Sequence, residues 1–139
     1  MPREFRYKRR VEFYETDQAG IVHFSWFYRY MEEAEHAMWR EAGMSIASTE
    51  FHVGWPRVAA SFEFFKPLRF EDEFEVRLRI EEISDKTIRY SCELMKDDAK
   101  LAAGTMKTAC VTRAPGVPMK STAIPADIAA RLSVFKKED

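Results

Sequence analysis

The chain has 139 residues, 46% hydrophobic and 32% charged, with a formal net charge of −1. Eleven Phe and three Trp are too many large apolar groups to leave in water, so the composition excludes a disordered chain. We expect one domain over residues 1–139 with a core over 5–113, and no nucleic-acid partner, because such partners usually require a basic excess.

Three features of the sequence bear on the cellular compartment. Cys92 and Cys110 lie in apolar, strand-like runs, which is typical of a reduced cytosolic protein. Acidic residues interrupt the segment after the basic start, so we expect no signal peptide. No long uncharged apolar run occurs, so nothing is expected to span a bilayer. We therefore expect a cytoplasmic protein.

The first predicted element is a strand over residues 5–13, where apolar side chains occupy the odd positions apart from position 9. A basic cluster crowds the same region: Arg3, Arg6, Lys8, Arg9 and Arg10. We interpret these residues as solvated, outward positions of the strand and expect no membrane contact. Turn residues over 16–20 then end the pattern.

A long helix is predicted over residues 24–42, because apolar residues recur there three and four apart. This apolar stripe consists of Phe27, Tyr30, Met31, Ala34, Met38 and Ala42. Gly43 is suited to the position just past the helix. The remaining surface is charged, and we expect it to face solvent: Arg29, Glu32, Glu33, Glu35, His36, Arg40 and Glu41.

Three segments then alternate apolar and polar residues with period two, at 57–64, 73–81 and 88–94, and a longer one at 101–112 is rich in small residues. Hairpin turns are expected at 84–86 and 96–98, and Pro125 opens a possible short helix over 125–135. One sheet face must bury the single long helix, which predicts a two-layer α+β domain. The open sheet edges would pair with a second copy, so we expect a homodimer with a continuous sheet.

The turn before the helix is the place where chemistry is expected. Asp17 lies close to the positive end of that helix, whose first amides have no partner within the helix. A carboxylate beside free amide donors is sufficient for acyl transfer, because the amides stabilise the oxyanion. The alternative from spacing alone is that Asp17 is an ordinary turn or capping residue.

The segment Tyr14-Glu15-Thr16-Asp17-Gln18-Ala19-Gly20-Ile21-Val22-His23-Phe24, followed by Phe27, Tyr30 and Glu32, resembles the signature of the 4-hydroxybenzoyl-CoA thioesterase family. In that family a turn of the form (D/E)-x-D-x-x-G-h-V, with h apolar, precedes the central helix. Segments 54–58 and 66–74 are also similar to the family's later strands. The resemblance implies a hotdog fold, in which a curved antiparallel β-sheet wraps around one long central α-helix.

The resemblance also implies an acyl-CoA thioesterase. Asp17 would be the nucleophile or the general base, and the backbone N–H of Phe24 would donate to the oxyanion. Gly20 would let the thioester approach closely, and Lys86 would meet the CoA phosphates, although Ser84 and Asp85 stand where a close relative has arginines. CoA enters as part of the substrate, and no cofactor or metal is expected.

In the family the site lies at the dimer interface, and the dimers pair into tetramers. The substrate-binding residues expected by resemblance are Gly20, His23, Val58, Ala59, Ala60, Ser61 and Lys86, with those of 58–61 coming from the partner subunit. Many relatives carry a Tyr-His pair where this chain has His23-Phe24. The one-position shift is about 100° on a helix, so we assign His23 no catalytic role.

Other groups of residues carry less weight as candidate functional sites. Glu33 and His36 have the spacing of di-iron ligands, but such sites need a second pair from another long helix. No serine nucleophile elbow, P-loop or dinucleotide fingerprint occurs. Aromatic residues over 26–30 are explained by core packing or by an aromatic acyl pocket. Two rival functions stay open: hydrolysis of acyl groups on acyl carrier protein, and a non-catalytic module that binds acyl thioesters.

Overall fold

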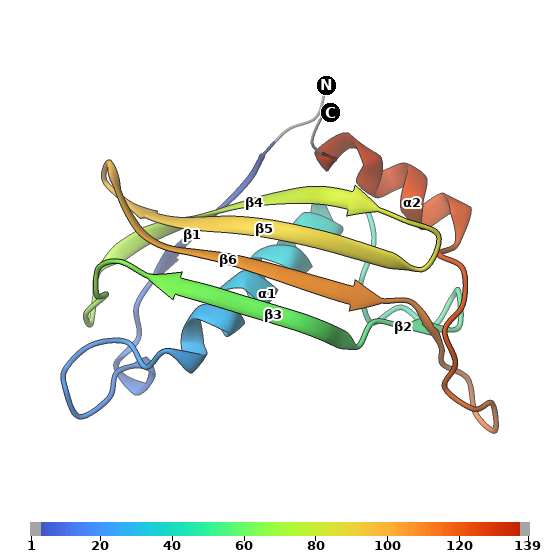
Figure 1. Ribbon diagram of the computed structural model, residues 1–139, viewed down its shortest axis with the longest axis horizontal. Coiled ribbons are helices and arrows are strands. Elements are labelled where there is room, and N and C mark those ends of the chain that lie inside the picture. Colours follow the sequence, from blue (N-terminus) through green and yellow to red (C-terminus); the bar gives the residue numbers. More distant parts are fainter. Residues whose placement is uncertain (1–3, 137–139) are drawn as a thin grey trace.

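A curved sheet and one long helix form the body of the molecule (Figure 1). The computed structural model describes residues 4–136. The main elements are β1 (Phe5–Arg10), α1 (Ser25–Glu41), β3 (Arg57–Phe64), β4 (Glu73–Ile83), β5 (Thr87–Lys96) and β6 (Ala99–Ala109). Shorter elements are the 3₁₀ turn η1 (Phe13–Glu15), β2 (Val53–Gly54), β7 (Val111–Thr112), α2 (Ala126–Leu132) and the 3₁₀ turn η2 (Ser133–Phe135).

The five long strands form one antiparallel sheet in the order β1-β4-β5-β6-β3. Pairs such as Leu78 with Cys92 set the register of the central strands. Helix α1 lies across one face of this sheet, as Figure 1 shows. The predicted α+β hotdog architecture is confirmed, and β1 and β3 are its two edges.

The helix buries its predicted apolar stripe against the sheet. Phe27, Tyr30 and Met38 are at most 3% exposed, and Trp39 joins them in the core. The chain leaves the helix through Gly43, whose φ of +83° is the left-handed conformation that glycine adopts freely. No helix within residues 4–136 has the length and hydropathy needed to cross a bilayer.

The first strand is shorter than predicted. It ends at Arg10, and residues 13–15 form a 3₁₀ turn in which Phe13 is 72% exposed. The side chain of Glu15 accepts a hydrogen bond from the amide of Glu12 at 2.8 Å. Because this bond curls the chain, the strand pattern cannot continue to Phe13.

The expectation that every basic residue of this strand faces solvent was wrong for Arg9. Its guanidinium lies beneath the sheet edge and bonds Glu15 and Glu33. Arg6, Lys8 and Arg10 are exposed, as predicted, and line a groove along β1 and β4 to which Arg9 also contributes. Arg3 lies outside the described residues.

The segment predicted as one strand over 101–112 is two strands. β6 ends at Ala109, and the amide of Cys110 bonds the carbonyl of Lys86 instead of continuing the ladder. Val111 and Thr112 then pair with Gly54 and Val53 in a separate two-stranded sheet. Part of the predicted connection before residue 57 is therefore strand β2.

Of the alternating apolar residues in β3, only Phe62 is partly buried against the core within one chain. Val58 is 56% exposed and Phe64 is 46% exposed, and Ala60 is also exposed. β3 pairs with β6 only, so its other edge meets no strand among residues 4–136. The half-buried pattern predicted for this strand is therefore not realised by one chain.

Candidate active site

The turn between η1 and α1 holds Asp17 in a defined geometry. The amide of Asp17 donates to the carbonyl of Ile21 at 2.9 Å, and the amide of Gly20 donates to the carbonyl of Asp17 at 2.9 Å. The carboxylate accepts the amide of Ala19 at 2.8 Å. Gly20 has a φ of +79°, which a side chain would strain. The turn thus orients the carboxylate through backbone bonds.

Asp17 lines a surface groove of about 430 Å³ at the start of α1. The groove is lined by Asp17, Ile21, Val22, Phe24, Phe27, Phe64, Phe65, Lys66 and Pro67. Three of its aromatic side chains, Phe24, Phe64 and Phe65, are between 46% and 60% exposed. The groove therefore offers apolar, aromatic walls to a ligand and one carboxylate at its edge.

The amide of Phe24 is available at the same place. Within residues 4–136 it donates to no acceptor, whereas the next amides all do. The amide of Ser25 bonds Nδ1 of His23, and the amide of Trp26 bonds the carbonyl of His23 at 2.9 Å. A free donor at the positive end of a helix is suited to a developing negative charge. Its predicted role as oxyanion donor stays a prediction.

The ring of His23 serves the helix start. Its Nδ1 lies 2.8 Å from Oγ of Ser25, and the ring packs on that of Phe24 with centroids 4.7 Å apart. His23 is not among the residues that line the groove. The substrate-binding role that the resemblance implies for His23 stays a prediction.

Sequence reasoning missed four residues of this groove. Phe64, Phe65, Lys66 and Pro67 follow the end of β3 and meet the start of the helix. A signal was present, because the segment from Lys66 belongs to the resemblance and two consecutive aromatics end a strand. Residue spacing does not show how β3 crosses α1, and this crossing brings the four residues close to Asp17.

Sequence reasoning also missed Glu15, which lies beneath the turn. Glu15 is fully buried, and its carboxylate accepts bonds from Arg9 and from the hydroxyl of Tyr30 at 2.8 Å. Burial and the adjacent Glu15 raise the pKa of Tyr30, so this hydroxyl keeps its proton. The acidic position of the (D/E)-x-D turn was the signal that pointed to Glu15.

The other predicted binding residues lie away from Asp17 within one chain. Lys86 is in the β4–β5 turn, at the end of the sheet opposite the Asp17 turn in Figure 1. None of residues 58–61 lines the Asp17 groove; Ala60 lines a separate groove of about 190 Å³ with Arg57. The substrate-binding roles of these residues remain predictions.

Glu35 was expected on the surface and is fully buried, which corrects that expectation. Its two oxygens are held by Arg57, which also bonds Glu32 at 3.1 Å. Burial raises the pKa of Glu35, and the charge of Arg57 opposes that shift. A charge on the helix can therefore lie inward because a guanidinium on β3 compensates it.

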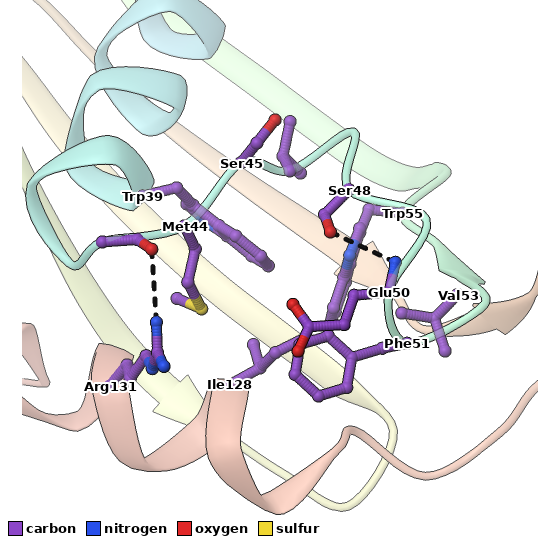
Figure 2. A pocket seen from close by; sticks show the side chains of 12 residues that line it. Trp39, Met44, Ser45, Ser48, Glu50, Phe51, Val53, Trp55, Ile128 and Arg131 are labelled. Carbon is purple, nitrogen blue, oxygen red and sulfur yellow. Dashed lines mark hydrogen bonds between the residues drawn. The ribbon is translucent and has the colours of Figure 1, made fainter.

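A smaller pocket of about 150 Å³ lies at the far end of α1, between the loop after the helix and α2 (Figure 2). Trp39 and Trp55 meet edge to face there, with ring centroids 5.1 Å apart. Its polar groups bond one another: Arg131 donates to the carbonyl of Gly43 at 3.2 Å. None of the predicted site residues lines this pocket.

A family model described as the thioesterase-like superfamily matches residues 11–132, which include the turn, the helix and every strand of the large sheet except β1. The chain belongs to this superfamily. It is a thioester hydrolase, and its non-catalytic alternative is set aside. The finer resemblance to the 4-hydroxybenzoyl-CoA branch is not established by this match.

Individual relatives of this thioesterase agree. A putative esterase of Aquifex aeolicus is 39% identical over 104 residues, which cover 74% of this chain and 81% of that protein. A 1,4-dihydroxy-2-naphthoyl-CoA thioesterase from Synechocystis is 25% identical in structure comparison, with a TM-score of 0.83 over 93% of this chain and 95% of that one. A gentisyl-coenzyme A thioesterase is 30% identical, with a TM-score of 0.81 over 91% of this chain and 98% of that one.

Proposed function

We propose that the protein hydrolyses acyl-CoA thioesters in the groove beside Asp17. The observation that carries the proposal is the meeting of one oriented carboxylate and one free helix amide, that of Phe24, at the same apolar groove. The amide would stabilise the oxygen that becomes negative when the thioester carbonyl is attacked.

Two routes satisfy this arrangement. As a general base, Asp17 takes a proton from water, the water oxygen bonds the carbonyl carbon, and collapse breaks the carbon–sulfur bond, with the proton passing to the CoA sulfur. As a nucleophile, Asp17 displaces the CoA thiolate to form an anhydride, which water then hydrolyses. Both routes end in free acid and CoA.

We further propose that the acyl group is aromatic. Phe24, Phe64 and Phe65 present exposed rings along the groove, and aromatic rings pair favourably with one another. The names of two relatives point the same way, because they specify dihydroxynaphthoyl and gentisyl thioesters. No cofactor is proposed beyond the CoA that the substrate itself carries.

The proposed working unit is a homodimer that pairs into a tetramer. A second copy would cover the exposed edge of β3 and its apolar residues. The partner's copies of residues 58–61 and of Lys86 would then bind substrate at the Asp17 groove. Cys92 and Cys110 are both unpaired and buried, which fits the cytoplasmic location that we propose.

The test is the hydrolysis of a panel of aromatic and aliphatic acyl-CoAs, followed by released thiol. Asp17→Asn should lower kcat by about 10²- to 10⁴-fold because it removes the base or nucleophile. The matched control is Asp98→Asn, which changes an exposed aspartate in the β5–β6 hairpin and should leave kcat unchanged. Parental turnover by Asp17→Asn would refute the proposal, and faster turnover of the same acyl groups on acyl carrier protein would reassign the carrier.

A further inference from the structure

Glu15 lies two residues before Asp17 and is completely buried, a rare situation for a glutamate unless it is paired. The four hydrogen bonds of its carboxylate come from three parts of the chain. Oε1 accepts Nη1 of Arg9 at 3.1 Å, the amide of Glu12 at 2.8 Å and the hydroxyl of Tyr30 at 2.8 Å, and Oε2 accepts Nη2 of Arg9. The side chain is therefore held from strand β1, from helix α1 and from its own turn.

The backbone of Glu15 closes the turn that carries the site. Its carbonyl accepts the amide of His23 at 2.9 Å, and the next residues, Thr16 and Val22, form an antiparallel bridge. Asp17 comes directly after Thr16 on one strand of this closed turn, and Phe24 comes directly after His23 on the other. The separation between the Asp17 carboxylate and the Phe24 amide therefore depends on where Glu15 is held.

The clamp on Glu15 is itself supported. Nε of Arg9 donates to Glu33 at 2.8 Å, the hydroxyl of Tyr7 donates to the same carboxylate at 3.2 Å, and the guanidinium lies 5.0 Å from the ring centroid of Tyr30. Charge-assisted bonds of this kind are strong and directional. Replacing a buried ion pair by apolar groups is often neutral or even stabilising, so stability alone gives no reason for this pair. What the pair provides is a defined orientation.

We propose that Glu15 is a positioning residue, which, clamped by Arg9 and Tyr30, holds Asp17 and the Phe24 amide at the separation that hydrolysis needs. The inference rests on the proposed function, because it concerns the same two groups. A displacement of about 1 Å at a reacting group can cost about 100-fold in rate. Glu15 need not touch the substrate to have such an effect.

The test compares Glu15→Gln with Glu35→Gln, using kcat and KM at a temperature where circular dichroism shows each variant folded. Glu15→Gln keeps the size of the side chain but turns one acceptor into a donor that faces Arg9; kcat should fall about 10- to 100-fold with KM changed less than about threefold. Glu35→Gln makes the same change in another fully buried glutamate, which Arg57 holds outside the Asp17 groove, so its kcat should stay within about twofold of the parent.

Tyr30→Phe provides a milder variant and decides the matter alone if Glu15→Gln does not fold. It deletes one bond to Glu15 and should lower kcat by about three- to tenfold, again without a matching change in KM. The inference is overturned if Glu15→Gln and Tyr30→Phe both keep the parental kcat, or if Glu35→Gln loses as much as Glu15→Gln, while Asp17→Asn is inactive. Parental activity of Asp17→Asn would instead overturn the proposed function itself.

Discussion

The backbone at Gly20 shows how much the site depends on single residues. Its φ of +79° closes the turn onto the carbonyl of Asp17, and no atom lies within 4 Å of the place that a Cβ would occupy. A side chain here would therefore meet no clash, only the cost of the left-handed conformation. A substitution at Gly20 therefore tests the effect of backbone strain on the site without any steric clash.

Gly20→Ala should lower the free energy of unfolding by about 1–2 kcal/mol and slow hydrolysis, because relief of the strain would move Asp17. Gly116→Ala is the matched control, since Gly116 also has a positive φ, of +74°, and open space around it, but lies in a loop outside the groove. Denaturant melts should show similar losses for both variants, with activity lost only in Gly20→Ala. Equal activities of the two variants would contradict this account of the turn.

At the scale of elements, the buried pair of Glu35 and Arg57 joins α1 to β3. Arg57 holds both oxygens of Glu35, and Glu35 is fully buried in mid-helix. Burial raises the pKa of Glu35 in the folded protein. A group with a raised folded pKa contributes stability at low pH and loses that contribution as pH rises above its unfolded value.

Arg57→Met should therefore destabilise the protein by about 3–5 kcal/mol near neutral pH, because it leaves a buried carboxylate without its cation. The loss should grow as pH rises above the ordinary pKa of 4.5, because Glu35 ionises freely in the unfolded chain while burial without Arg57 opposes its ionisation in the folded one. The double variant Glu35→Leu with Arg57→Met should recover most of the stability. Urea unfolding at several pH values measures both effects, and a loss independent of pH would contradict them.

These elements also show what the sequence alone could predict. Helix α1 was predicted because amphipathic spacing is a local property: Phe27, Tyr30 and Met38 reveal the buried face without any knowledge of the sheet. Glu35 and Arg9 were placed wrongly because a charge is buried only where a distant partner compensates it. The partner of Glu35 is 22 residues away in the sequence.

The residues of the candidate site likewise fall into those that a local motif indicates and those that it does not. Asp17, Gly20 and the Phe24 amide lie within one turn, so a motif could indicate them together. Phe64 and Lys66 join the groove through the crossing of two elements, which spacing does not encode. The same limit applies to β3, whose exposed apolar residues find no cover among residues 4–136.

At the scale of the whole molecule, the unpaired edge of β3 is the feature that one chain leaves incomplete. Val58 and Phe64 expose apolar surface along it, beside a row of unpaired backbone groups. A continuous sheet across two copies would bury both. The partner would then also bring its residues 58–61 toward the Asp17 groove.

Val58→Glu should accordingly give a folded monomer with little activity, because a charge would be buried in the proposed interface. Val134→Glu is the control: Val134 is 46% exposed in η2, away from β3, and should leave the dimer intact. Light scattering coupled to size exclusion gives the mass, and the thiol assay gives the activity. A monomeric parent that is fully active would contradict the proposal.

The most direct test of the central claim is a single-turnover measurement with enzyme in excess over an aromatic acyl-CoA, so that differences in binding do not enter the rate. The parent should release CoA rapidly, whereas Asp17→Asn should retain the bound thioester and release CoA at least about 100-fold more slowly. Equal rates of CoA release from the two proteins would show that the carboxylate of Asp17 does not take part in breaking the thioester.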